Sequence, residues 1–187
     1  MVKRVFDLVM GTFFLIVLAI PMIMIAVAIR LTSKGPALYW SNRKGKKNVL
    51  FMMPKFRTMK VNTPAVATHL FENPDIFLTP IGSFLRRTSL DEIPQLFSIV
   101  QGKMSFVGPR PALFNQEDLV ALRTEKGVDQ IVPGLTGWAQ VNGRDEIPIQ
   151  VKVELDVEYK EQQTFCFDMK ILWMTFIKAI KKDGVVH

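Results

Sequence analysis

Two adjacent carboxylates, Asp91 and Glu92, lie between a pair of arginines and a proline in segment 86–94, which reads RRTSLDEIP. One interpretation is structural, because Ser89 and Glu92 have the spacing of a capping box and Pro94 is tolerated near a helix start. Capping motifs are common, so this interpretation is favoured on frequency alone. The functional interpretation is compatible with it. A helix N-terminus keeps a carboxylate ionised, and an ionised carboxylate can act as a nucleophile or hold a metal ion.

Several basic residues lie in turns rich in glycine and proline, or beside the acidic pair. Arg110 stands between Pro109 and Pro111, whose rings fix two backbone φ angles. Such rigidity suits a guanidinium that grips a phosphate through two hydrogen bonds, whereas a solvated surface charge does not need it. The candidates for phosphate binding are Lys55, Arg57, Arg86, Arg87, Arg110 and Arg144.

Composition limits the chemistry further. The chain has 187 residues and a net charge of +7, so an anionic partner is expected: nucleic acid, anionic lipid or a phosphorylated metabolite. One cysteine and two histidines exclude the usual zinc sites, which leaves carboxylates as ligands for magnesium or manganese. The cysteine, Cys166, has a phenylalanine on each side, which favours a small buried hydrophobe.

The elements that must position these residues begin with an uncharged, apolar run at 8–29, which is typical of a membrane segment. Pro21 lies inside the run and predicts a break in the helix. Basic residues flank both ends, and positive flanks prefer the cytoplasm. A helix that enters the membrane and returns on the same face satisfies both flanks, while an ordinary kinked span is the alternative. We therefore divide the chain into a membrane segment at 1–30 and a second domain at 31–187, which would carry any catalytic residues.

The sequence of residues 31–187 predicts a mostly helical structure with few short strands. Short helices are expected at 92–100 and 112–126, and a loop with little regular structure at 61–80. At 151–159, apolar and charged residues alternate as in a strand, but Val151, Leu155 and Tyr159 also have the i, i+4 spacing of a helix. The pattern therefore does not distinguish strand from helix. At 165–180 the lysines fall on one arc of a helix. That arrangement fits a helix lying in the membrane interface, or equally one packed on the core.

At this point the sequence resembles a known family. The matching segments are 55–59 (KFRTM), 85–97 (LRRTSLDEIPQLF), 104–111 (MSFVGPRP) and 133–144 (PGLTGWAQVNGR), followed by Asp156 and Tyr159 in the spacing DxxY. They occur in order over essentially the whole chain. The chain is similar to the bacterial sugar transferases, the monotopic polyprenyl-phosphate phosphoglycosyl transferases.

The resemblance implies a re-entrant N-terminal helix, a domain facing the cytoplasm from the bacterial plasma membrane, and amphipathic helices at the interface. It also implies a helix at 150–163. The implied reaction moves a sugar 1-phosphate from a UDP-sugar to polyprenyl (undecaprenyl) phosphate, an early step in making glycoconjugates such as exopolysaccharide or lipopolysaccharide. Asp91 would be the nucleophile, and Asp91 and Glu92 would hold Mg²⁺. The expected substrate-binding residues are Lys55, Arg57, Arg86, Arg110, Pro111, Gln140, Arg144 and Asp156.

Two other functions are compatible with the same residues. The acidic pair could activate water in a membrane-bound, magnesium-dependent diphosphate hydrolase. The positive charge could instead belong to a non-catalytic module that binds anionic lipid or nucleic acid. The basic residues lie in proline and glycine turns, not in patches on helices or strands with stacking aromatics, so we expect no nucleic acid partner.

Overall fold

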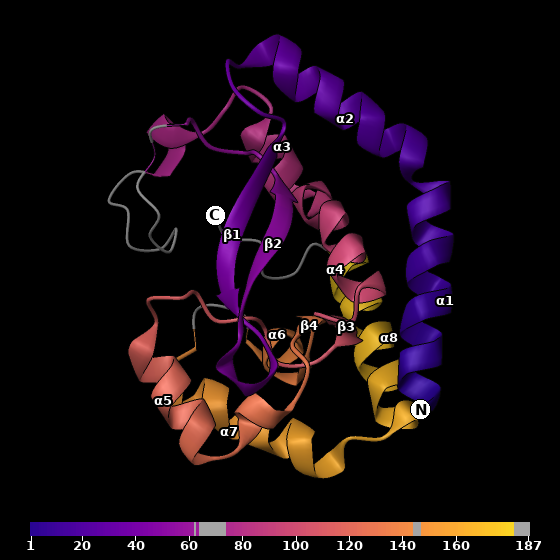
Figure 1. The fold of residues 1–187 in the computed structure, drawn as a ribbon, viewed down its shortest axis with the longest axis vertical. Helices are drawn as coiled ribbons and strands as arrows, with labels where there is room; N and C mark the ends of the chain where they lie inside the picture. Colours follow the sequence, from indigo (N-terminus) through magenta and orange to yellow (C-terminus); the bar gives the residue numbers. More distant parts are fainter. Residues whose placement is uncertain (62, 64–73, 144–146, 182–187) are drawn as a thin grey trace.

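The computed structural model describes residues 1–61, 63, 74–143 and 147–181. The predicted class is confirmed: the described chain is mostly helical, with few short strands in two small sheets. Figure 1 shows helices α1 (Val2–Val17) and α2 (Ala19–Thr32) along one side of the molecule, the β1–β2 hairpin (38–56) near its centre, and helices α5 (Glu117–Glu125) and α7 (Ile149–Gln162) at the lower end. Most of the loop predicted at 61–80 lies outside the described residues.

The N-terminal run forms two helices, α1 (Val2–Val17) and α2 (Ala19–Thr32), which meet at an angle of 59°. The break lies at Leu18, so the prediction of a break at Pro21 was wrong by three residues. Pro21 is instead in the first turn of α2. A proline ring clashes with the carbonyl four residues earlier, here that of Val17, so the chain bends ahead of the proline.

Helices α1 and α2 leave much of their apolar surface uncovered. Within the described part of the chain, no single helix has the length and apolar character to cross a bilayer, but the bent α1–α2 pair meets those criteria together. Their exposed apolar side chains include Val5, Val9, Phe13, Ile16, Val17, Ile20, Ile23, Met24, Val27 and Leu31. A surface this large and apolar is typical of a site that contacts lipid or another protein.

Strands β1 (Leu38–Lys44) and β2 (Leu50–Phe56) form an antiparallel hairpin in which Leu38 pairs with Phe56 and Lys44 with Leu50. A 3-10 turn, η1 (Lys46–Asn48), connects them. Strand β2 packs against the segment that carries the acidic pair. The hairpin therefore brings Lys55 to the acidic pair.

Helix α3 (Gly82–Arg87) leads into η4 (Leu90–Gln95), a 3-10 helix that continues as α4 (Leu96–Val100). The helix predicted at 92–100 is thus present, but it starts earlier and its first half is wound more tightly. The capping box is wrong. Ser89 has a left-handed backbone with φ 55°, and its side chain caps nothing. The side chain of Glu92 turns to basic residues elsewhere in the fold.

In the remaining described residues, a small parallel sheet is joined to four helices and two further 3-10 turns. The sheet pairs β3 (Ser105–Val107) with β4 (Gly134–Thr136). The turns are η3 (Pro74–Phe77) and η5 (Val128–Gln130). The helices are α5 (Glu117–Glu125), α6 (Trp138–Asn142), α7 (Ile149–Gln162) and α8 (Phe165–Lys181).

Three local predictions can be judged on these elements. The helix predicted at 112–126 begins only at Glu117, because Leu113 forms a β-bridge with Arg43. The ambiguous stretch at 151–159 is helical, in α7. Cys166 is exposed on α8, not buried as its neighbours suggested, because the helix turns it away from the core.

The main core lies between the sheet and helices α1, α4, α7 and α8, and includes Ile99, Met104, Val107, Tyr159 and Ile171. Helix α8 both packs on this core and exposes an apolar face. Ile171 is fully buried, whereas Trp173, Phe176 and Ile180 are more than half exposed. Packing on the core is confirmed for one face of this helix, while the membrane interface stays a prediction for the exposed face.

A buried polar cluster ties the start of α1 to the rest of the domain. Lys3 Nζ donates to Asp168 Oδ2 at 2.6 Å and to the Val107 carbonyl at 2.9 Å. The Tyr159 hydroxyl donates to Asp168 Oδ1 at 2.7 Å. Asp7 is buried on α1 and accepts hydrogen bonds from the β3 segment. The N-terminal helix is thus held to β3, α7 and α8 by specific bonds.

Candidate active site

Glu92 is the centre of a cluster of charges. Its Oε1 accepts a hydrogen bond from Lys55 Nζ at 2.7 Å and another from Arg110 Nη2 at 3.2 Å. Burial by itself would raise the pKa of Glu92, but the two cations outweigh burial and hold that pKa well below its usual range. Glu92 is therefore a carboxylate at any physiological pH.

Asp91 has the opposite environment although it is the adjacent residue. Its exposed fraction is 8%, and within the described part of the chain it makes no hydrogen bond or salt bridge. Burial raises its pKa to about 6; Lys55 opposes this shift, and the negative charge of Glu92 adds to it. The pair therefore consists of one neutralised carboxylate and one carboxyl group that is free to react.

Arg86 is close enough to Asp91 for their charges to interact. Its Nε donates to Thr58 Oγ1 at 3.0 Å, which fixes the guanidinium half-buried at the end of α3. Burial lowers the pKa of Arg86, and attraction to Asp91 partly reverses that effect. The positive charges of Lys55, Arg86 and Arg110 thus act together on the acidic pair.

The structure brings three of the predicted substrate-binding residues to one region and places others elsewhere. Lys55, Arg86 and Arg110 lie around the acidic pair, while Pro111 follows Arg110 in the chain and its carbonyl accepts from Arg43. Arg57 is buried and holds the residues after α2, donating to the Ser33 carbonyl at 3.1 Å and the Ser33 hydroxyl at 2.7 Å. The prediction for Arg144 concerns a residue outside the described part of the chain.

Among the described residues, Asp156 and Gln140 make no hydrogen bond with Asp91 or Glu92. Asp156 is 1% exposed and binds Arg123 at 2.6 Å, so its described partner is a buried arginine. Gln140, on α6, has both amide atoms buried with no hydrogen-bond partner among the described residues. Gln95, four residues after Asp91, likewise buries an unpartnered side-chain nitrogen. Sequence reasoning missed Gln95 and Arg123, since neither stands in a turn rich in glycine or proline.

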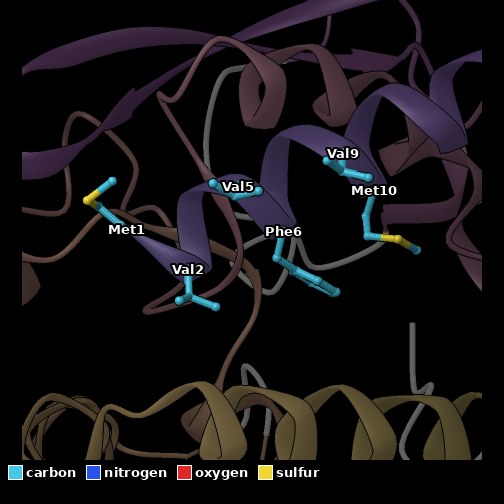
Figure 2. Close-up of a pocket in the computed structure, with 6 residues that line it drawn as sticks. All are labelled: Met1, Val2, Val5, Phe6, Val9 and Met10. Carbon is cyan, nitrogen blue, oxygen red and sulfur yellow. The ribbon is translucent and has the colours of Figure 1, made fainter.

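A pocket at the start of α1 is a different kind of site. Its volume is about 540 Å³. Figure 2 shows the residues that line it, which are Met1, Val2, Val5, Phe6, Val9 and Met10. All of these side chains are apolar, and Val2, Phe6 and Met10 point to the same side of the helix. A nucleotide or phosphate needs polar partners that this pocket does not have.

The acidic pair fits a magnesium ion by its donor chemistry. Mg²⁺ prefers carboxylate oxygens, and proteins often hold it with one or two carboxylates while substrate phosphates and water complete the shell. The described residues contain no cluster of three His, Cys, Asp or Glu side chains, so an all-protein cage is not formed there. Asp91 has no competing partner, and Glu92 uses only Oε1 for its cations. Asp91 and Glu92 Oε2 are thus suitable ligands for an ion shared with a phosphate.

A carboxyl pair surrounded by cations is a site of the kind that enzymes use on phosphate esters. The model of the bacterial sugar transferase family matches residues 1–182. The chain therefore belongs to the bacterial sugar transferase family, as the sequence motifs predicted.

Curated relatives cover the chain almost completely. The uncharacterized sugar transferase EpsL of Bacillus subtilis is 37% identical over 185 residues, which are 98% of this chain and 89% of that protein. The UDP-glucose:undecaprenyl-phosphate glucose-1-phosphate transferase of Escherichia coli is 37% identical over 96% of this chain. The undecaprenyl-phosphate galactose phosphotransferase of Salmonella typhimurium is 35% identical over 97% of it. The chain spans only 40% and 41% of the lengths of these last two proteins.

Proposed function

We propose that the chain is a phosphoglycosyl transferase that moves a sugar 1-phosphate from a UDP-sugar to undecaprenyl phosphate, through a covalent intermediate on Asp91. The observation that carries the proposal is the pairing of two adjacent carboxylates in opposite states. Glu92 is neutralised by Lys55 and Arg110, and Asp91 is left without a partner among the described residues. The relatives named for glucose 1-phosphate and galactose phosphate transfer to undecaprenyl phosphate support this substrate class.

The reaction consists of two displacements at one phosphorus. In the first, a carboxylate oxygen of Asp91 bonds to the β-phosphorus of the UDP-sugar, and the bond from that phosphorus to the bridging oxygen breaks. UMP leaves with the electron pair, and the sugar phosphate remains as an acyl phosphate on Asp91. In the second, an oxygen of undecaprenyl phosphate bonds to the same phosphorus. The Asp91 carboxylate leaves, and the product is undecaprenyl-diphosphate-sugar.

Charge is the main obstacle to the first step. Two unit charges 4 Å apart repel by about 4 kcal/mol at an effective dielectric constant near 20. Lys55, Arg86 and Arg110 all attract negative charge at Asp91, and the same cations would stabilise the oxygens of the diphosphate. Asp91 is only 8% exposed, so an acyl phosphate formed there would meet less water than one on an exposed side chain.

Asp91 and Glu92 are the residues that would hold a magnesium ion, which would supply positive charge against the phosphates during the transfer. The chain's own residues have separate tasks around it. Glu92 keeps Lys55 and Arg110 at the acidic pair, and Arg86 holds negative charge near Asp91. The reactive form of Asp91 is the carboxylate, which a cation favours.

The exposed apolar faces support a membrane location for the same enzyme. The bent α1–α2 pair would enter and leave one leaflet, with α8 lying in the interface beside it, and the domain at 31–187 would face the cytoplasm from the bacterial plasma membrane. Trp173, Phe176 and Ile180 present an apolar face on α8, while Lys170 lies 5.5 Å from the ring centre of Trp138. A domain seated at headgroup depth can reach both a lipid phosphate and a soluble nucleotide-sugar.

The test separates the covalent transferase from the hydrolase. The full chain in nanodiscs is incubated with Mg²⁺ and UDP-glucose or UDP-galactose, without lipid acceptor, and analysed by intact mass and UMP release. The proposal expects about one UMP per enzyme and a sugar-phosphate adduct that peptide mapping locates on Asp91. Asp91→Asn should give neither, whereas Asp118→Asn, which changes an exposed carboxylate on α5, should match the wild type.

Addition of undecaprenyl phosphate should then discharge the adduct and start multiple turnovers. Repeated UMP release without acceptor, or an adduct that persists in Asp91→Asn, would contradict the proposal. The first result would favour a diphosphate hydrolase, and the second would place the nucleophile at another residue.

A further inference from the structure

The backbone on either side of Arg110 is held by hydrogen bonds from distant parts of the chain. Gly134 N–H donates to the Pro109 carbonyl at 2.9 Å, and Lys44 N–H donates to the Ala112 carbonyl at 2.9 Å. Between them, Arg43 Nη1 donates to the Pro111 carbonyl at 3.1 Å. The carbonyl of Arg110 itself accepts from Arg123 Nη1 at 2.8 Å. Four consecutive carbonyls are thus fixed from β4, β1 and α5.

This loop depends on outside donors because of its sequence. Pro109 and Pro111 have no N–H group, so the segment has little capacity to fix itself through its own backbone hydrogen bonds. The proline rings restrict φ but leave the position of the whole loop open. The donors from other elements therefore fix the backbone position of Arg110. From that position, the Arg110 guanidinium reaches Glu92.

Arg123 differs from the other donors because its side chain is buried and oriented by a second residue. Its side chain is 8% exposed, and Nε and Nη2 both donate to Asp156 Oδ2, at 2.9 and 2.6 Å. The remaining nitrogen, Nη1, points at the Arg110 carbonyl. Asp156, on α7, thus sets the plane of a guanidinium on α5, and that guanidinium holds the peptide of Arg110.

We propose that Arg123, oriented by Asp156, is a positioning residue for the reaction: it fixes Arg110 so that its guanidinium meets the phosphates beside Asp91. This inference rests on the proposed function for the role of Arg110. It gives Asp156 a part in catalysis through Arg123, without contact with substrate. An ammonium has no planar fork, so a lysine at 123 could hold Asp156 or the Arg110 carbonyl but not both in the same geometry.

The test is a double-mutant cycle on UMP release in the presence of undecaprenyl phosphate. Arg123→Lys should lower kcat/KM by about tenfold, because a shift of a phosphate ligand by a fraction of an ångström weakens transition-state contacts. Arg110→Ala should cost more. In the Arg110→Ala background, Arg123→Lys should change kcat/KM by less than about twofold, since the residue through which it acts is gone.

Ile171→Val is the matched control for loss of core packing. It removes one methylene group from a fully buried side chain in the main core, on α8, so it should lower the melting temperature and leave kcat/KM of the folded enzyme unchanged. An equal loss from Arg123→Lys in both backgrounds would indicate a purely structural role and overturn the proposal. A wild-type kcat/KM for Arg123→Lys would also overturn it.

A second measurement does not depend on catalysis. Hydrogen–deuterium exchange of the peptide covering residues 105–114 should be faster in Arg123→Lys than in the wild type, and unchanged in Ile171→Val. If the wild type releases no UMP, the proposed function fails and the exchange experiment still decides whether Arg123 fixes this loop. Exchange at the wild-type rate in Arg123→Lys would overturn the inference whatever the enzyme does.

Discussion

Two clusters of buried carboxylates and cations hold this domain together, and they differ in how completely they are paired. At the start of α1, both oxygens of Asp168 accept hydrogen bonds, one from Lys3 and one from Tyr159. Around η4, Glu92 accepts from Lys55 and Arg110, but Asp91 has no hydrogen bond within the described structure. The two clusters use the same residue types, and only the second leaves a buried carboxyl group unpaired.

This difference suggests a structural role for the Asp168 cluster and a reactive role for the Asp91 cluster. A buried polar network that is fully satisfied fixes one arrangement of the chain, whereas an unpaired buried carboxyl group lowers stability and is kept only for a purpose. The first cluster anchors α1 to β3, α7 and α8. Under the proposed function, the second leaves Asp91 available for a ligand that brings its own charge. The comparison predicts opposite consequences when a carboxylate is removed from each cluster.

The largest effect on stability is expected from Asp168→Ala. The substitution leaves the Lys3 ammonium and the Tyr159 hydroxyl without their shared acceptor, and removing one partner of a buried pair costs about 3–4 kcal/mol. The melting temperature in detergent should fall by roughly 10 °C, while UMP release per folded molecule at low temperature stays near that of the wild type. A small shift in melting temperature would mean that this cluster is not a scaffold.

The opposite effect is expected from Asp91→Asn, and it should depend on pH. The pKa of Asp91 is raised from 3.8 to about 6, so the folded state binds its proton more tightly than the unfolded state does. The stability from this group is fully present below about pH 4 and is lost as pH rises through 6.

In EDTA, the Asn variant should therefore be as stable as the wild type at pH 4, and more stable at pH 7.5 by about 2–3 kcal/mol. Thermal unfolding of both proteins across this pH range measures the difference. An advantage that does not vary with pH would show that Asp91 is not the titrating group.

Local sequence patterns predicted the helical class of this fold and identified some of the residues around the acidic pair. The acidic pair, the proline-flanked Arg110 and the helical class were readable because each depends on neighbours in sequence. The position of the bend was missed because a proline acts on the residue four positions earlier, at Val17. The capping box was misassigned because the partners of Glu92 are Lys55 and Arg110, which no local pattern identifies.

Long-range pairing also explains why Arg123 was overlooked. Its partner Asp156 lies 33 residues away on another helix, so its position in a regular helix gave no signal. The same holds for Asp156: its sequence match suggested a substrate contact, while the structure pairs it with a buried arginine.

Within the site, Glu92→Gln should reduce UMP release by between about tenfold and a hundredfold. A neutral amide binds cations more weakly than a carboxylate, so Lys55 and Arg110 lose the charge that gathers them. Steady-state kinetics at saturating magnesium measure the loss. Glu125→Gln changes an exposed carboxylate on α5 and is the matched control. If the two variants have equal rates, then the neutralised carboxylate is a scaffold group like Asp168.

The smallest effect concerns the ion itself. A ligand that binds only the folded state at ten times its Kd stabilises it by about 1.4 kcal/mol, which raises the melting temperature by roughly 3–6 °C for a chain of this size. Mg²⁺ should produce this shift in the wild type at pH 7.5 and little of it in Asp91→Asn, because the unpaired carboxylate is the ligand without a competing cation. In Asp168→Ala the shift should remain, since that cluster has no free oxygen to offer. Equal shifts in all three proteins would mean that magnesium binds elsewhere, and the contrast between the clusters would then lie in their proton affinity alone.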